Sequence, residues 1–134
     1  MKKISAKFNA TVLVVDDYIV NQELAKEMLE MMGCQVDVAE DGNEALRMYK
    51  ENDYDLMFLD VQMPEKDGYQ LTREIRQIET GNKHSIIIAI TANALVGDKE
   101  KCLEAGMDDY ISKPIKGADL EIMMEKYLSH QKVS

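Results

Sequence analysis

Several residue types are scarce in this sequence. The 134 residues include no tryptophan, two prolines and two cysteines. So few prolines, with only seven glycines, argue against a fibrous or disordered chain. Cys34 and Cys102 match no metal-ligand or redox spacing, so we expect two reduced thiols. No apolar run approaches the roughly 18 residues of a transmembrane helix, and no signal peptide is visible, so we expect a cytoplasmic protein.

Basic residues are also outnumbered. The chain has 16 Lys and Arg against 25 Asp and Glu, a formal net charge of -9. Contacts to phosphate backbones need clustered Lys and Arg, so we expect no direct binding to nucleic acid or to an anionic membrane. A cation or a basic partner surface suits this balance better. The length favours a single domain with its own core.

The domain bounds follow from periodicity. Residues 1–9 show little of it and are interpreted as a leader or linker, residues 10–130 as one domain and residues 131–134 as a tail. Short β-branched runs then alternate with amphipathic patterns, which predicts an α/β fold with a parallel sheet covered by helices on both faces. The expected strands are 11–16, 35–39, 54–60, 85–91 and 110–112. The expected helices begin near Ile19, Asn43, Asp67, Val96 and Ala118.

The helical patterns also predict which side chains face the sheet. The first helix should end at Gly33, and the Asn43 side chain should cap the second. The fourth helix has a weak apolar stripe, so we expect it to be the most mobile. The side chains expected to point inward from the first, third and fourth helices are Val20, Leu24, Met28 and Met32, then Leu71, Ile75 and Ile78, then Cys102, Leu103 and Ala105.

Polar residues recur where the predicted strands end. Asp16 and Asp17 follow the first strand, Asp60 ends the third, Thr91 ends the fourth and Lys113 follows the fifth. The carboxyl ends of strands in an open parallel sheet form the ligand crevice, so we expect these side chains to meet there. Each residue alone also fits a structural role, for example Asp16 and Asp17 as a helix N-cap. Their joint placement at matched strand ends favours a site.

The predicted site has the parts needed for phosphoryl transfer. Three neighbouring carboxylates repel one another unless a cation neutralises them, and oxygen ligands without His or Cys suit Mg²⁺ or Mn²⁺. A carboxylate can act as the nucleophile, while the metal and Lys113 neutralise charge on the transferred group. The Thr91 hydroxyl is placed to donate a hydrogen bond to a phosphoryl oxygen.

Four ordered segments resemble the receiver domains of response regulators, the CheY-like superfamily. The resemblance covers nearly the whole chain after Asn9. It implies a flavodoxin-like, three-layer fold of five strand-helix units with the strand order 2-1-3-4-5. The segments are VLVVDD (Val12–Asp17), DLMFLDVQMPEKDG (Asp55–Gly68), IIAITANA (Ile87–Ala94) and AGMDDYISKPI (Ala105–Ile115).

The resemblance also implies roles for individual residues. Asp60 would be the phosphoacceptor, and the metal would be held by Asp16, Asp17, Asp60 and the backbone carbonyl of Gln62. Lys113 would pair with the phosphoryl group.

A conformational switch and an unusual peptide bond are implied as well. Thr91 would be the switch hydroxyl, and Tyr110 the aromatic residue that turns inward with it. The Lys113-Pro114 peptide bond would be cis, which is rare enough among X-Pro bonds to be a sharp prediction.

The resemblance implies a signalling role rather than an enzyme. The domain would take a phosphoryl group from a sensor histidine kinase or a histidine phosphotransfer domain and assist its own phosphorylation and dephosphorylation. The surface of the fourth helix, fifth strand and fifth helix would then change. The segment around Thr91 and the MDDYISKPI segment look most like receivers of hybrid sensor kinases or phosphorelays, with a stand-alone regulator as the alternative. Kinase activity would belong to other domains, and we expect a monomer or weak dimer.

Two other classes share part of this pattern. A Mg²⁺-dependent phosphatase with an aspartyl nucleophile normally carries a second Asp two residues later, where this chain has Gln62. A pseudo-receiver binds partners without being phosphorylated, and it usually lacks one or more of the acidic residues that are present here.

Overall fold

The computed structural model describes residues 7–63, 66–80, 83–92 and 96–133, with the backbone alone for residues 96–98. Strands and helices alternate along these residues as the sequence predicts. In chain order the elements are β1 (Thr11–Val15), α1 (Ile19–Met31), β2 (Gln35–Ala39), α2 (Gly42–Glu51), β3 (Leu56–Asp60), α3 (Gly68–Ile78), β4 (Ile86–Thr91), α4 (Val96–Ala105), β5 (Asp109–Ser112), α5 (Gly117–Leu128) and the short 3-10 helix η1 (Ser129–Gln131).

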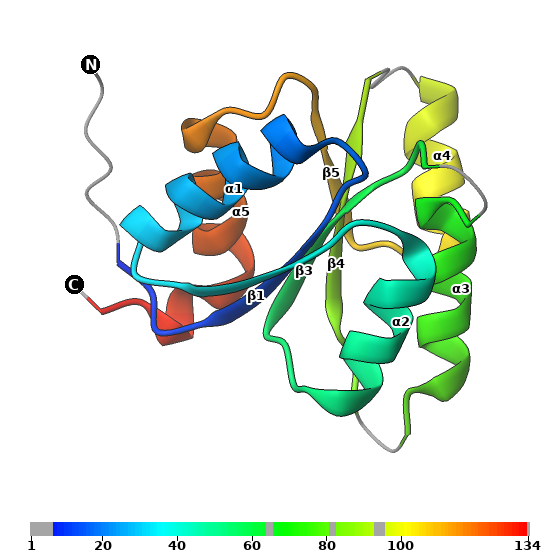
Figure 1. Cartoon of the computed structure of the whole chain (residues 1–134), viewed down its shortest axis with the longest axis horizontal. Coiled ribbons are helices and arrows are strands. Elements are labelled where there is room, and N and C mark those ends of the chain that lie inside the picture. The colour runs from blue at the N-terminus through cyan, green and yellow to red at the C-terminus, as the bar shows by residue number, and fades with distance from the viewer. Residues whose placement is uncertain (1–6, 64–65, 81–82, 93–95, 134) are drawn as a thin grey trace.

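The strands form one parallel sheet in the order β2-β1-β3-β4-β5. Helices α1 and α5 cover one face, and α2, α3 and α4 cover the other (Figure 1). The flavodoxin-like fold and its strand order are therefore confirmed. Because all strands run in the same direction, their carboxyl ends lie along one edge of the sheet, where the predicted site residues sit.

The core has two layers, one on each face of the sheet. Central strand β3 is buried at all five positions, as expected for a strand covered on both sides. Adjacent side chains alternate between the layers: Phe58 packs on the side of α1 and α5, and Leu59 on the side of α2 and α3. Asp60, the last residue of β3, therefore ends a strand that is packed on both faces.

Helix α2 begins one residue earlier than predicted, and its capping residue lies two positions earlier. Its N-cap is Asp41, whose side chain accepts a hydrogen bond from the Glu44 amide at 2.8 Å, and Asn43 is exposed. The predicted Asn43 cap is therefore wrong. Both residue types cap helices well, and Asp41 is the one with extended backbone dihedrals. Helix α3 begins as predicted, with Asp67 accepting from the Gln70 amide at 2.9 Å.

Three of the predicted inward side chains point to solvent. Val20, Ile78 and Leu103 are 52%, 38% and 53% exposed. Each four-residue step turns a helix about 40° past a full turn, so the series from Val20 to Met32 drifts off one face. Val20, at the N-terminal end of this series, therefore faces solvent instead of the sheet. Ile78 is the last residue of α3, and Leu103 lies next to the buried Cys102.

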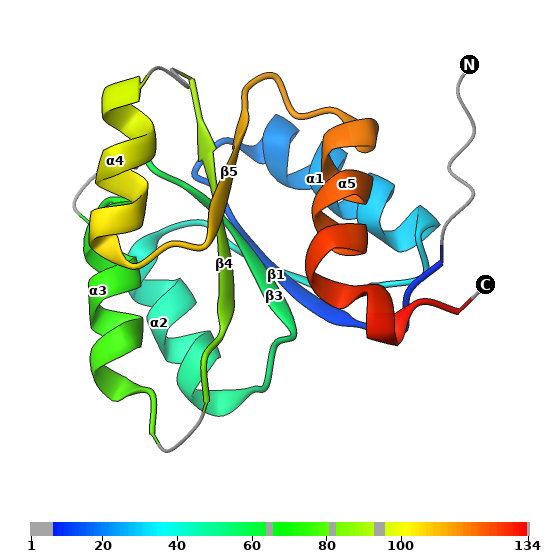
Figure 2. The same cartoon turned by 180° about the vertical axis from the view of Figure 1, so that it is seen from behind.

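The two ends of the described chain pair with each other. Phe8 forms an antiparallel bridge with Lys132, donates its amide to the Met32 carbonyl at 2.7 Å, and is 1% exposed within the core of α1 and α5. Both ends lie on the same side of the molecule (Figure 2). Core packing on this side thus starts at Phe8, inside the segment interpreted as a leader.

The two cysteines lie in the core. Cys34 and Cys102 are both free and buried. Burial raises the pKa of the Cys34 thiol to about 11, so it stays protonated at neutral pH. Of the helices in the described part of the chain, none has the length and apolar character needed to cross a bilayer.

Candidate functional site

The acidic residues after β1 and at the end of β3 come together. One carboxylate oxygen from each of Asp16, Asp17 and Asp60 lies within 4.8 Å of the other two. Strands β1 and β3 are adjacent in the sheet, which brings residues more than forty positions apart in the sequence to one point. The structure thus forms the acidic cluster that the strand ends predict.

Asp16 is fixed by the turn between β1 and α1. It is fully buried, its amide donates to the Ala39 carbonyl at 3.1 Å, and its Oδ1 accepts from the Tyr18 amide at 2.9 Å. The N-cap of α1 is Tyr18, which makes no side-chain cap hydrogen bond. Asp16 and Asp17 therefore do not occupy the N-cap position, and Asp17 is exposed at the mouth of the cluster.

Asp60 is held on both carboxylate oxygens. Oδ1 accepts from the Gln62 amide at 2.9 Å, and Oδ2 lies 3.1 Å from the Lys113 Nζ. The start of α3 also packs closely behind it, since a Cβ atom on Gly68 would lie 2.8 Å from the Asp60 carbonyl oxygen. A side chain at position 68 would push this loop away from the site.

Burial shapes the electrostatics of the cluster. It raises the pKa values of both Asp16 and Asp60, although hydrogen bonds from the Tyr18 and Gln62 amides oppose the shifts. The charge of Asp60 raises the pKa of Asp16 further, and Lys113 lowers both. The Oδ2 atom of Asp16 is buried without a hydrogen-bond partner. An unpartnered carboxylate oxygen among three acidic groups and no His or Cys fits a hard divalent cation such as Mg²⁺.

The other predicted site residues surround the same strand ends. Thr91 ends β4 one position beyond Ile90, the register partner of Asp60, and its side chain is buried. Its carbonyl accepts from the Lys113 amide at 2.8 Å. Tyr110 is half-buried in β5 and packs against the core layer of α2 and α3.

Two predictions about the loops have different outcomes. The Lys113-Pro114 peptide bond is cis, which confirms the prediction. Gln62 contacts Asp60 through its amide, and its backbone carbonyl as a metal ligand remains a prediction.

Two polar residues near the site were missed by sequence reasoning. The Asn21 side chain interacts with the Asp16 carboxyl group and lowers its pKa, and the Gln22 side chain donates to the Asp16 carbonyl at 2.7 Å. Both residues lie outside the apolar stripe of α1, which is the pattern that periodicity detects. The available signal is that two amide side chains follow the exposed apolar run of Tyr18 to Val20, in the first turns of a helix that starts at the site.

Comparison with known proteins agrees with the fold and the site. Residues 12–125 match the family of response regulator receiver domains, and the chain belongs to that family. It is 44% identical over 129 residues to hybrid signal transduction histidine kinase L of Dictyostelium discoideum, covering 91% of this chain and 7% of that protein. The chain spans only a small part of the curated relatives it matches, for example 6% of hybrid signal transduction histidine kinase B of the same organism and 16% of probable histidine kinase 1 of Oryza sativa.

Two solved structures of receiver domains are similar throughout. One is the receiver of Ssk1 from Saccharomyces cerevisiae, crystallised with the histidine phosphotransfer protein Ypd1, with a TM-score of 0.88, 27% identity and coverage of 96% of this chain and 95% of that one. The other is the receiver of sensor histidine kinase PA1611 from Pseudomonas aeruginosa, with magnesium in its active-site cleft. It has a TM-score of 0.81 and 42% identity, and the match covers 90% of this chain and 98% of that one.

Proposed function

We propose that this receiver domain accepts a phosphoryl group on the Asp60 carboxylate from a phosphohistidine. The observation that carries the proposal is the placement of Asp60 in the acidic cluster, with Lys113 beside its Oδ2 atom. The Gln62 amide fixes Oδ1, and the Lys113 ammonium lies 3.1 Å from Oδ2. A buried carboxylate held in this way is oriented for attack, and a cation beside it offsets charge on the incoming group.

A divalent cation completes the proposed site. Asp16, Asp17 and Asp60, with the Gln62 carbonyl, would hold Mg²⁺, or Mn²⁺ in its place. The bound ion would neutralise the phosphoryl oxygens and the three carboxylates. Support comes from the oxygen-only donor set and from the unpartnered Asp16 Oδ2.

The proposed reaction transfers the group without net oxidation or reduction. An Asp60 oxygen forms a bond to phosphorus while the bond from phosphorus to the donor imidazole nitrogen breaks. The imidazole leaves with the bonding electron pair. Lys113 then faces a phosphoryl group instead of a bare carboxylate, and the Thr91 hydroxyl donates to one of its oxygens.

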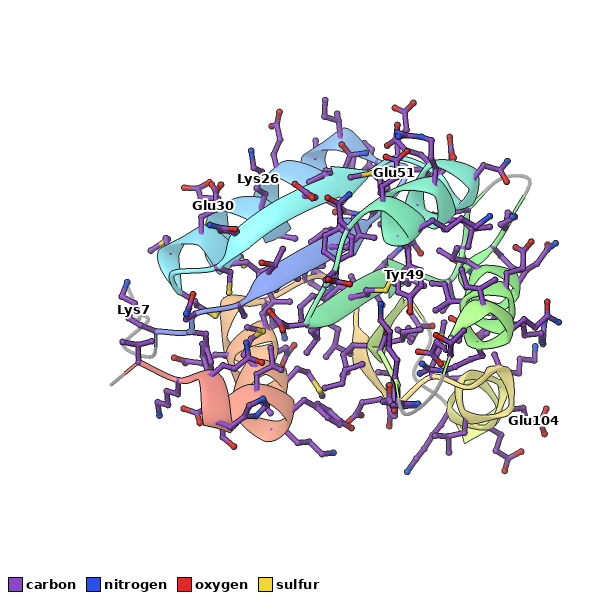
Figure 3. All side chains as sticks on the ribbon, turned by 90° about the horizontal axis from the view of Figure 1, so that it is seen from below. Lys7, Lys26, Glu30, Tyr49, Glu51 and Glu104 are labelled. Atoms are coloured by element: carbon purple, nitrogen blue, oxygen red, sulfur yellow. The ribbon has the colours of Figure 1, made fainter. Side chains whose placement is uncertain are left out.

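The proposed output is a change on the surface of α4, β5 and α5. Thr91 and Tyr110 lie on adjacent strands. Movement of the Thr91 hydroxyl toward the phosphoryl group would leave room for the Tyr110 side chain to turn inward. Helix α4 is lightly anchored: among its described side chains, Cys102 and Ala105 are buried, and Glu104 points away from the sheet (Figure 3). It is therefore suited to move.

The partners follow from the chemistry of the donor. A sensor histidine kinase or a histidine phosphotransfer domain would supply the phosphoryl group. We place the domain in a hybrid histidine kinase or a phosphorelay, as a signalling module that promotes its own phosphorylation and dephosphorylation without acting on another substrate. The similarity to hybrid kinases and to a receiver crystallised with a phosphotransfer protein supports this placement.

NMR with a phosphoryl analogue tests the proposal. We expect Mg²⁺ with beryllium fluoride to shift the amide signals around Asp60 and Thr91 and, through the switch, those of Tyr110 and α4. Asp60→Asn is the matched control and should show no beryllium fluoride response. A wild-type protein that does not respond would be a pseudo-receiver. Steady hydrolysis of small phosphate monoesters would instead support the aspartyl phosphatase class.

A further inference from the structure

The turn that carries Asp16 and Asp17 is tied to helix α1 by a side chain. Gln22 lies in the second turn of α1, and its Nε2 donates to the Asp16 backbone carbonyl at 2.7 Å. Its own amide donates to the Tyr18 carbonyl at 3.1 Å. Gln22 thus closes a loop of hydrogen bonds around the three residues that connect β1 to the helix.

The contact holds the metal side of Asp16 in place. Asp16 uses its amide on β2 and its Oδ1 on the Tyr18 amide, while Oδ2 is left without a hydrogen-bond partner. The hydrogen bond from Gln22 restrains the Asp16 carbonyl, which is the other backbone polar group of Asp16. Each of the two peptide groups that flank the Asp16 Cα is therefore held by a hydrogen bond, which keeps the Asp16 carboxylate close to those of Asp17 and Asp60.

The side chains at the start of α1 add little restraint through packing. The Tyr18, Ile19 and Val20 side chains are 57%, 61% and 52% exposed, so the start of α1 is not anchored by packing. The helix also lacks a side-chain N-cap. A helix start without a cap or buried apolar residues is prone to fray, and a half-buried glutamine on the next turn restrains it.

We propose that Gln22 is a positioning residue that fixes the β1–α1 turn for cation binding, acting through the Asp16 carbonyl and not by touching the cation. The inference rests on the proposed function, because it concerns the same cluster. Outer residues that orient metal ligands commonly change metal affinity when they are replaced. Gln22 would therefore set the affinity of the acidic cluster without contributing a ligand or a charge.

The test compares Gln22→Met with wild type and with Gln77→Met. Methionine is close to glutamine in size and has no donor, and Gln77 is exposed on α3, away from the cluster. Isothermal titration of the metal-free proteins with MgCl₂ should show affinity about three- to tenfold weaker for Gln22→Met and unchanged for Gln77→Met. Amide hydrogen exchange without metal should be faster at Asp17 and Tyr18 in Gln22→Met.

A second readout separates positioning from general loss of structure. Acetyl phosphate labelling at increasing Mg²⁺ should give Gln22→Met a higher half-saturating Mg²⁺ concentration and a plateau rate close to wild type. A merely structural role would lower the plateau and leave the half-saturating concentration alone. Equal Mg²⁺ affinity and exchange in Gln22→Met and wild type would overturn the inference. Wild-type protein that binds no Mg²⁺ would instead refute the proposed function, while the exchange comparison would still test the restraint.

Discussion

Asp60 is a buried carboxylate, and burial disfavours its charged form. Its side chain is 2% exposed, and burial raises its pKa above the ordinary value of 3.8 despite the nearby Gln62 amide and Lys113 ammonium. Asp16 is buried in the same way, and the negative charge of Asp60 adds to its shift. The site therefore accumulates negative charge that the folded chain alone neutralises poorly, which is a reason for it to bind cations.

A pH dependence of stability follows in the absence of metal. Between the ordinary Asp pKa of 3.8 and the raised folded-state value, the folded protein binds more protons than the unfolded chain. The free energy of unfolding should therefore fall as pH rises through this window. Asp60→Asn keeps an acceptor for the Gln62 amide and removes the charge. We expect it to flatten this dependence and to stabilise the protein by about 1 kcal/mol at neutral pH.

Urea unfolding with EDTA present, over a series of pH values, measures this effect. Asp53→Asn is a matched control because the Asp53 side chain is 99% exposed, and it should change stability little. If Asp60→Asn lowers stability at neutral pH, the ion pair with Lys113 outweighs the cost of burial and our interpretation of the cluster is wrong.

At the scale of elements, helix starts decide how loops meet the site. Asp41 caps α2 and Asp67 caps α3, and each bonds an amide three residues ahead. Glu44 also accepts a hydrogen bond from the Glu40 amide, so the start of α2 is closed on both sides. These caps fix the loops after β2 and β3, and the second of those loops follows Asp60.

Substitution at the start of α2 distinguishes the observed cap from the predicted one. Asp41→Ala should lower the free energy of unfolding by about 1 kcal/mol, because the Glu44 amide loses its acceptor. Asn43→Ala should cost much less, since Asn43 is exposed and already inside the helix. Thermal or urea unfolding of both variants makes the comparison. Equal losses would mean that the Asp41 bond contributes nothing measurable.

The elements also show what the sequence can and cannot reveal. The strand ends were predictable because continuous apolar runs such as β3 stop at a polar residue, and parallel topology then brings those residues together. The choice between Asp41 and Asn43 as the cap of α2 could not be predicted, because both residue types cap helices and only the backbone dihedrals distinguish them. The Gln22 contact with the Asp16 carbonyl depends on the shape of a turn, which periodicity does not encode.

At the scale of the whole molecule, the chain ends contribute more than their sequence suggests. Phe8 lies outside any periodic segment, yet it fills the core between α1 and α5 because residues 131–133 pair alongside it. Lys7, labelled in Figure 3, lies at this junction and donates to the Met31 carbonyl. Such packing arises from contacts between distant segments, so pattern along the sequence does not predict it.

In the proposed function, the whole domain uses Asp60 as its nucleophile at the carboxyl edge of the sheet, beside a surface that would change on phosphorylation. Incubating it with Mg²⁺ and acetyl phosphate and weighing the intact protein by mass spectrometry tests that arrangement. We predict that wild type gains one phosphoryl group that hydroxylamine removes, as expected for an acyl phosphate, and that Asp60→Asn gains none. Persistent labelling of Asp60→Asn, or a label on another residue of wild type, would contradict Asp60 as the phosphoacceptor.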